Sequence, residues 1–140
     1  MSEVSFSFDS DAFAASLSGI RERVGQGLKA ASVYLLSESA RTIRSGGTGW
    51  PGFKRLPSRP HQLLYDTGRL IGSLSPGGAA NLMDVQDDGM TIQVGSNLAY
   101  ARAQNLGDPA HSLPARPFMF LDSDRSHQMA SIIQRYINEG

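Results

Sequence analysis

The stretch "SLPARPFMFLDSD", residues 112–124, decides how the C-terminal part of this chain is built. Pro114 and Pro117 fix φ and remove two backbone donors, so they exclude a helix at these positions. The apolar run at residues 118–121 is expected to form a short strand or an extended segment. Asp122 then stands where a helix N-cap belongs, because a carboxylate there satisfies backbone N–H groups and complements the helix dipole. The stretch therefore predicts a rigid turn that leads into a final helix.

That final helix is expected over residues 123–138. Its apolar side chains recur at helical spacing. They are Met129, Ile132, Ile133, Tyr136 and Ile137.

A longer helix is expected near the N-terminus, over residues 10–45. Apolar residues step by three or four along it, from Phe13 to Leu35. Gly19, Gly25 and Gly27 each weaken a helix by roughly 1 kcal/mol relative to alanine, so a bend or an interruption is expected there. The glycines of "SGGTG", residues 45–49, are typical of a helix stop.

The middle of the chain predicts a β-hairpin between shorter helices. Met83 and Val85 alternate on one strand, Met90, Ile92 and Val94 alternate on the other, and "QDDG" makes the turn, with Asp88-Gly89 suited to positive φ. Short helices are expected over residues 63–75, after a cap at Asp66 or Thr67, and over residues 97–107. Alternating apolar residues predict a strand or arm over residues 1–9.

Together these elements predict one α+β domain, residues 1–140. A long N-terminal helix and a C-terminal helix pack on a small antiparallel β-sheet, with a long Gly/Pro-rich basic loop. The absence of cysteine excludes disulfides and thiolate metal sites. We expect no signal peptide and no membrane helix, and hence a soluble protein made in a cytoplasm.

The loop is expected over residues 46–62, where four glycines and three prolines leave no periodic pattern. Although the net charge is zero, no Asp or Glu occurs between Glu38 and Asp66. The basic side chains there are Arg41, Arg44, Lys54, Arg55 and Arg59. Trp50 and Phe53 suit stacking on single-stranded bases or anchoring in a protein interface. A solvated loop, a DNA contact and a contact with an acidic partner all remain open.

Signals for catalysis are weak. His61, His111 and His127 show no metal-binding spacing, "SGGTG" lacks the rest of a phosphate-binding loop, and no nucleophile elbow is present. Asp66, Asp122 and Asp124 could form an acid pair or a magnesium site, but helix capping explains Asp122. We therefore expect no enzyme, no cofactor and no metal. The alternatives are a nucleic-acid-binding module that uses the basic residues 41–59, and a small hydrolase built from His61, Asp66 and His111.

Three stretches, taken in order, resemble motifs of one known family. They are "LLYDTGRLIGSL" (63–74), "VGSNLAYARAQNLG" (94–107) and "LPARPFMFL" (113–121). The matching residues are Leu64, Thr67, Gly68, Leu70, Ser73, Gly95, Tyr100, Ala101, Gln104, Gly107, Pro114, Arg116, Pro117 and Phe118. The family is the tailed-phage virion morphogenesis group, the tail completion and neck proteins of Mu-like phages and their relatives. The similarity covers about residues 30–138; at Gln104-Asn105-Leu106 the chain departs from the family, which often has a histidine nearby.

The resemblance implies a structural virion protein at the head–tail junction, made in the host bacterial cytoplasm. Such proteins form a homo-oligomeric ring, commonly a hexamer, that completes or terminates the tail and joins it to the head. The implied partners are other copies of the chain, the tail tube protein and head connector or stopper proteins, with DNA passing through the lumen and no membrane. The family has no catalytic residues to carry over.

Within this resemblance, Arg116 has two possible roles. It can fork onto a carboxylate of its own subunit or of a neighbour. Alternatively it makes an ordinary contact inside its own loop. The expected partner-binding residues are thus Arg116 together with Trp50, Phe53 and the five basic residues between positions 41 and 59.

Overall fold

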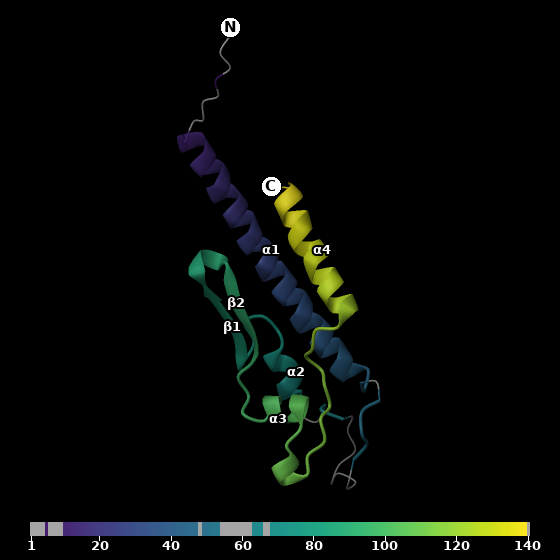
Figure 1. The fold of residues 1–140 in the computed structure, drawn as a ribbon. Helices are drawn as coiled ribbons and strands as arrows, with labels where there is room; N and C mark the ends of the chain where they lie inside the picture. Colours follow the sequence, from purple (N-terminus) through teal and green to yellow (C-terminus); the bar gives the residue numbers. More distant parts are fainter. Residues whose placement is uncertain (1–4, 6–9, 48, 54–62, 66–67, 140) are drawn as a thin grey trace.

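Helix α1 (Ser10–Arg44) is the element on which the rest of the molecule is assembled (Figure 1). The computed structural model describes residues 5, 10–47, 49–53, 63–65 and 68–139. In it the hairpin lies on one side of α1, and α4 (Ser123–Glu139) runs antiparallel along the other side (Figure 1). The predicted α+β class is confirmed. The expected arm at residues 1–9, except Ser5, and the expected cap at Asp66 or Thr67 fall outside the described residues.

The glycines of α1 do not interrupt it; two of them let neighbours approach. A Cβ on Gly25 would lie 3.3 Å from the carbonyl oxygen of Gly89 in the hairpin turn. A Cβ on Gly27 would lie 3.0 Å from Cα of Ile133 in α4. Since residues two apart point to nearly opposite sides of a helix, these contacts place the hairpin and α4 on opposite faces of α1. The expected interruption is therefore wrong, and the glycines serve packing.

The predicted glycine stop of α1 is confirmed. Gly46 and Gly47 both have positive φ, 82° and 72°. The Gly47 N–H donates to the Thr42 carbonyl and the Gly46 N–H to the Ile43 carbonyl. This pair of bonds is the Schellman motif, which satisfies the last carbonyls of a helix.

The hairpin joins β1 (Asn81–Gln86) to β2 (Thr91–Ser96) through the 3-10 turn η1 (Asp87–Gly89). Met83 pairs with Val94 and Val85 with Ile92, as the alternation predicts. Met90 lies in the turn rather than in the strand, and positive φ falls at Asp87 and Gly89. The two strands form the sheet of the described chain. Residues 118–121 pair with neither strand and bend at Met119, so the strand expected there does not form.

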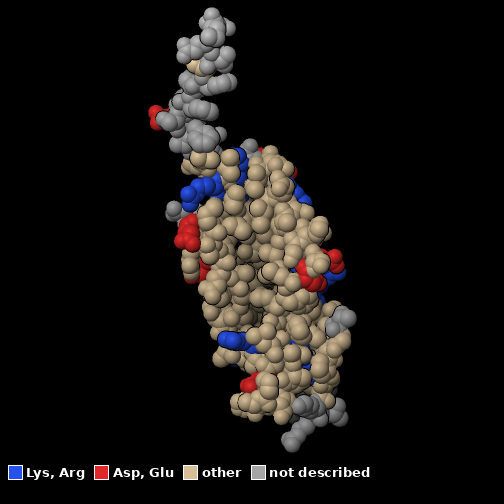
Figure 2. All heavy atoms as spheres, viewed as in Figure 1, with Lys and Arg blue, Asp and Glu red and all other residues tan. Residues whose placement is uncertain are grey.

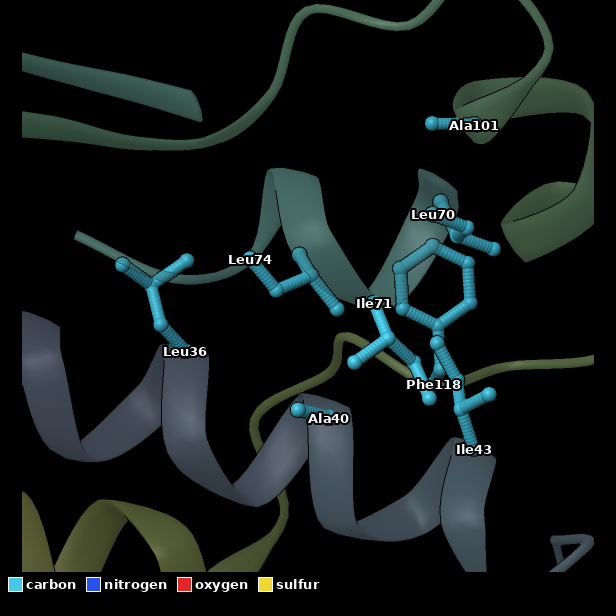
Figure 3. Packing of buried hydrophobic residues seen from close by; sticks show 8 residues of the cluster. All are labelled: Leu36, Ala40, Ile43, Leu70, Ile71, Leu74, Ala101 and Phe118. Carbon is cyan, nitrogen blue, oxygen red and sulfur yellow. The ribbon is translucent and has the colours of Figure 1, made fainter. Parts of the chain in front are cut away.

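Two short helices and one further 3-10 turn complete the fold. They are α2 (Arg69–Ser73), α3 (Ala101–Leu106), which ends at Gly107 as expected, and η2 (Pro109–His111). The core forms where α2, α3 and the segment that carries Phe118 meet the C-terminal half of α1 (Figure 3). Its buried members are Leu36, Ala40, Ile43, Leu70, Ile71, Leu74, Ala101 and Phe118. None of the described helices is both long and apolar enough to cross a membrane.

Candidate functional site

The three motif stretches meet around Phe118, which is 2% exposed. Its ring lies between Leu70 of α2 and Ile43 of α1, with Ala101 of α3 nearby (Figure 3). Each motif therefore supplies at least one member of a single apolar cluster. Burial of this kind is the main favourable contribution to folding, so these motif residues act in the structure of the domain.

Asn105 fixes the backbone on which Phe118 sits. Its Oδ1 accepts hydrogen bonds from the N–H groups of Phe118 (2.9 Å) and Met119 (3.0 Å). Its Nδ2 donates to the Met119 carbonyl at 3.0 Å. One side chain thus satisfies three backbone groups of a segment that has no strand partner. Sequence reasoning assigned Asn105 no role, because its partners lie 13 and 14 residues away without a local pattern.

Ser73 and its neighbours tie the first motif to the hairpin. The Ser73 and Ser96 hydroxyls share a hydrogen bond of 2.7 Å. Asn81 Nδ2 donates to the Ser73 carbonyl at 2.9 Å and reaches the Gly95 carbonyl at 3.4 Å. Ser73 is fully buried, so its motif position is explained by this polar link between α2 and the sheet.

The motif glycines have local structural reasons. Gly68 has φ of 81° at the N-cap of α2, and no side-chain hydrogen bond caps that helix. Gly107 has φ of 81°, and a Cβ there would lie 2.9 Å from the Ala115 nitrogen. Gly95 is buried beside Met119. Thr67 falls outside the described residues, and Tyr100 is 40% exposed rather than in the core.

Arg116 is buried, at 7% exposed, and binds its own chain. Its Nε donates to the Pro51 carbonyl at 2.9 Å and its guanidinium NH2 group to the Gly52 carbonyl at 2.8 Å. Both acceptors are backbone carbonyls of the same chain. These contacts correspond to the intramolecular alternative and not to the fork onto a carboxylate. Arg116 thus shapes the loop that carries Trp50.

Trp50 docks on the residue that follows Arg116. Its indole Nε1 donates to the Pro117 carbonyl at 3.1 Å, and its ring packs against the core. A groove of about 470 Å³ opens beside it. Thr42, Ser45, Trp50, Pro117 and Phe120 line this surface, which we call the Trp50–Phe120 groove.

The predicted basic residues divide into two sets. Arg41 and Arg44 lie exposed in the last turn of α1, and Arg41 is 3.4 Å from a Glu38 carboxylate oxygen. Lys54, Arg55 and Arg59 fall outside the described residues, while Phe53, at their edge, is 40% exposed. The exposed cations therefore begin at the end of α1 that borders the Trp50–Phe120 groove.

Arg125 holds Phe120 in the lining of the Trp50–Phe120 groove, and the sequence did not predict this role. It is 5% exposed, and its guanidinium lies 3.8 Å from the centroid of the Phe120 ring. It donates to the carbonyls of Phe118 and Phe120, both at 3.1 Å, and reaches the Glu38 carbonyl at 3.3 Å. It also donates to the Thr42 hydroxyl at 2.8 Å. These contacts tie α1, residues 118–120 and α4 together, since a guanidinium presents five donors in a rigid fork.

Groups that could carry chemistry stay dispersed in the described structure. Asp122 is the N-cap of α4, as expected, because its Oδ1 accepts the Arg125 N–H at 2.8 Å. His111 lies 2.7 Å from Asp108 on the surface, and His127 is exposed on α4. His61 and Asp66 fall outside the described residues. Within the residues described, no three His, Asp or Glu side chains gather closely enough to hold a metal ion.

Large apolar side chains remain at the surface. In the view of Figure 2 most of the molecule is uncharged, and acidic and basic groups are scattered toward its margins. Among the described residues, the exposed large apolar side chains are Leu17, Ile20, Phe53, Tyr65, Val85, Tyr100, Leu106, Phe120, Leu121 and Tyr136. Such side chains mark surfaces that bind other proteins when they gather together. Phe120 lies with Trp50 in the lining of the groove, and Leu121 follows it directly in the chain.

Comparisons of the chain with family models, with curated protein sequences and with solved structures find no match.

Proposed function

We propose that this chain is a structural virion protein of the phage head–tail junction. Copies of it form a ring, a hexamer, that completes the tail and joins it to the head. The partners are the tail tube protein and the connector or stopper proteins of the head, and DNA passes through the lumen. The chain works by binding and has no catalytic role.

One observation carries the proposal. The three stretches that resemble the tail completion motifs lie far apart in sequence, yet they meet around Phe118 as one structural unit. These motif residues build the core of the domain, and the proposal rests on the resemblance of the motifs to those of the tail completion proteins. The exposed apolar side chains and the cations at the end of α1 supply adhesive surface.

Deletion of the gene from the phage or prophage that encodes it tests the proposal. The expected phenotype is accumulation of filled heads and separate tails, with few joined particles, reversed by the wild-type gene in trans. Normal yields of joined, infectious particles without the gene would contradict the proposal.

Complementation with variants refines that test. Arg55→Glu with Arg59→Glu is expected to leave the fold intact, as judged by circular dichroism, and to lower the yield of tailed particles. Arg135→Glu on the exposed outer face of α4 is the matched control and should complement fully. Unchanged infectivity of the Arg55/Arg59 double variant would remove the basic loop from the assembly surface.

A nucleic-acid-binding module is the second candidate, favoured by the exposed Arg41 and Arg44 in a window without carboxylates. It predicts DNA binding by the isolated protein whose affinity falls steeply as salt rises, because bound phosphates release counterions. Weak or absent binding at about 0.15 M salt, beside a genetic junction defect, separates the two functions.

A further inference from the structure

We propose that the hairpin tip of one copy docks into the Trp50–Phe120 groove of a second copy. The hairpin tip is defined as Asp84, Val85, Gln86 and Asp87. The inference rests on the proposed ring and names the two surfaces that would build it.

The hairpin tip is an exposed acidic segment with an apolar side chain at its centre. Val85 is 50% exposed, although its cross-strand partner Ile92 is half-buried. The carboxylates of Asp84 and Asp87 flank it. Their donors in the structure are neutral: the Gln86 amide at 2.7 Å and the Thr91 hydroxyl at 2.9 Å. The tip is thus ordered by hydrogen bonds from neutral donors, and no ion pair to Asp84 or Asp87 is found among the residues that the structure describes.

The groove offers the complementary surface. Trp50, Pro117 and Phe120 give it apolar walls, and Leu121, 61% exposed, follows directly. Both aromatic rings are held in place, Trp50 by the Pro117 carbonyl and Phe120 by the Arg125 guanidinium. Fixed aromatic anchors of this kind lose little conformational entropy when a partner binds.

Positive charge borders the groove. Arg41 precedes Thr42 and lies one helical turn before Ser45, so it stands on the groove side of α1. Its side chain is 77% exposed, and its contact with Glu38 is a long surface pair of 3.4 Å. Such exposed pairs are weak, so Arg41 can exchange Glu38 for a carboxylate of the tip. Arg44 adds a second exposed cation in the same turn.

The two surfaces lie at different places along one subunit. The hairpin turn touches α1 at Gly25, whereas the groove begins at Thr42. Seventeen residues of helix separate them by about 26 Å. Repeated from copy to copy, a contact between two different patches is heterologous, and it closes a ring when the rotation between copies closes. The two complementary surfaces are therefore compatible with a ring.

Cysteine cross-linking tests the contact, because the chain contains no cysteine of its own. Val85→Cys and Ser45→Cys are made in separate proteins, mixed at high concentration and mildly oxidised. Both sites are exposed, so folding should survive, which circular dichroism checks. A disulfide-linked heterodimer is expected to form roughly tenfold faster than in a mixture of Val85→Cys with Ala130→Cys, a control on the outer face of α4. Equal rates, or no cross-link, would overturn the inference.

Charge exchange gives an independent measurement. Asp84→Lys with Asp87→Lys in the Val85→Cys protein should suppress the cross-link, and Arg41→Glu with Arg44→Glu in the Ser45→Cys protein should do the same. Mixing the two reversed proteins should restore it. Failure to restore, with both variants folded, would contradict the proposed pairing of charges.

The outcomes distinguish this contact from the proposed function. Rings seen by electron microscopy without the Val85–Ser45 cross-link would overturn the contact and leave the ring standing. A junction-defect phenotype is a separate, genetic result and does not depend on these variants. A third outcome is that the isolated protein binds DNA, that Arg41→Glu with Arg44→Glu abolishes this binding, and that no cross-link between copies forms. This outcome would assign the cations to nucleic acid and overturn the inference.

Discussion

The Arg125 guanidinium donates to the Thr42 hydroxyl at 2.8 Å, which joins the first turn of α4 to the last turns of α1. The two residues are 83 positions apart in the chain. Through the same side chain, the carbonyls of Phe118 and Phe120 are held against α1. The Phe120 wall of the Trp50–Phe120 groove is therefore held by one buried cation.

Arg125→Met should destabilise the fold by roughly 3 kcal/mol, because several charge-assisted hydrogen bonds are lost and buried carbonyls lose their donor. Arg125→Lys should recover only part of this, since an ammonium cannot reproduce the fork. The measurement is urea unfolding followed by circular dichroism. Arg135→Met, on the exposed face of the same helix, should change stability by less than about 0.5 kcal/mol. Equal effects at both positions would contradict the buried role of Arg125.

Asn105→Ala should cost roughly 2–3 kcal/mol, since the N–H groups of Phe118 and Met119 lose their acceptor. Asn105→Asp keeps the acceptor oxygen and loses the donor to the Met119 carbonyl. Its loss of unfolding free energy should therefore differ from the loss in Asn105→Ala. Exposed Asn138→Ala is the control. The same denaturant series measures all three variants. An Asn105→Ala protein as stable as the control would show that water replaces the side chain there.

Two glycines of α1 should respond to alanine in opposite directions. At Gly19 a Cβ would meet only the end of the flexible Arg23 side chain at 3.4 Å, so Gly19→Ala should stabilise by up to about 1 kcal/mol. At Gly27 the new methyl would lie 3.0 Å from the Ile133 backbone, so overpacking should outweigh that gain and leave a net loss of roughly 1 kcal/mol. Thermal unfolding of both variants measures the difference. Stabilisation by both would mean that α4 packs less closely on α1.

Alkaline pH should weaken the fold through Tyr34. Burial raises the pKa of its phenol above the ordinary value of 10.0, and the nearby Glu38 carboxylate adds to the shift. The unfolded chain therefore loses this proton at a lower pH than the folded protein. The corresponding stability is fully present below pH 10 and is lost as the pH rises through the folded-state pKa.

Tyr34→Phe should accordingly lose less stability than the wild type as the pH rises above about 10. Urea midpoints across this range measure the difference, and the two proteins compared below pH 9 serve as the reference. The same alkaline loss in both proteins would show that Tyr34 does not contribute.

The sequence predicted those elements whose signal is local. The three- and four-residue steps locate α1 and α4, alternation locates the hairpin, and Asp122 caps α4 as expected. Propensity alone misjudged the glycines of α1, because tertiary contacts with α4 and the hairpin use the space they leave.

The groove could not be predicted in the same way. Arg125 looks like one more polar residue in an amphipathic helix, and its partner carbonyl at Glu38 is 87 residues away. Arg116 was singled out, but its partners are backbone carbonyls that no residue pattern marks. Trp50 was expected to dock on something, and the structure shows that it docks on the Pro117 carbonyl of its own chain.

The most direct test of the junction account is the position of the protein in finished particles. Tailed particles purified from the encoding phage or prophage would be labelled with an antibody to the chain and viewed by electron microscopy. The account predicts label between head and tail, together with a fixed copy number per particle by quantitative mass spectrometry. Joined, infectious particles that contain none of the protein would contradict it.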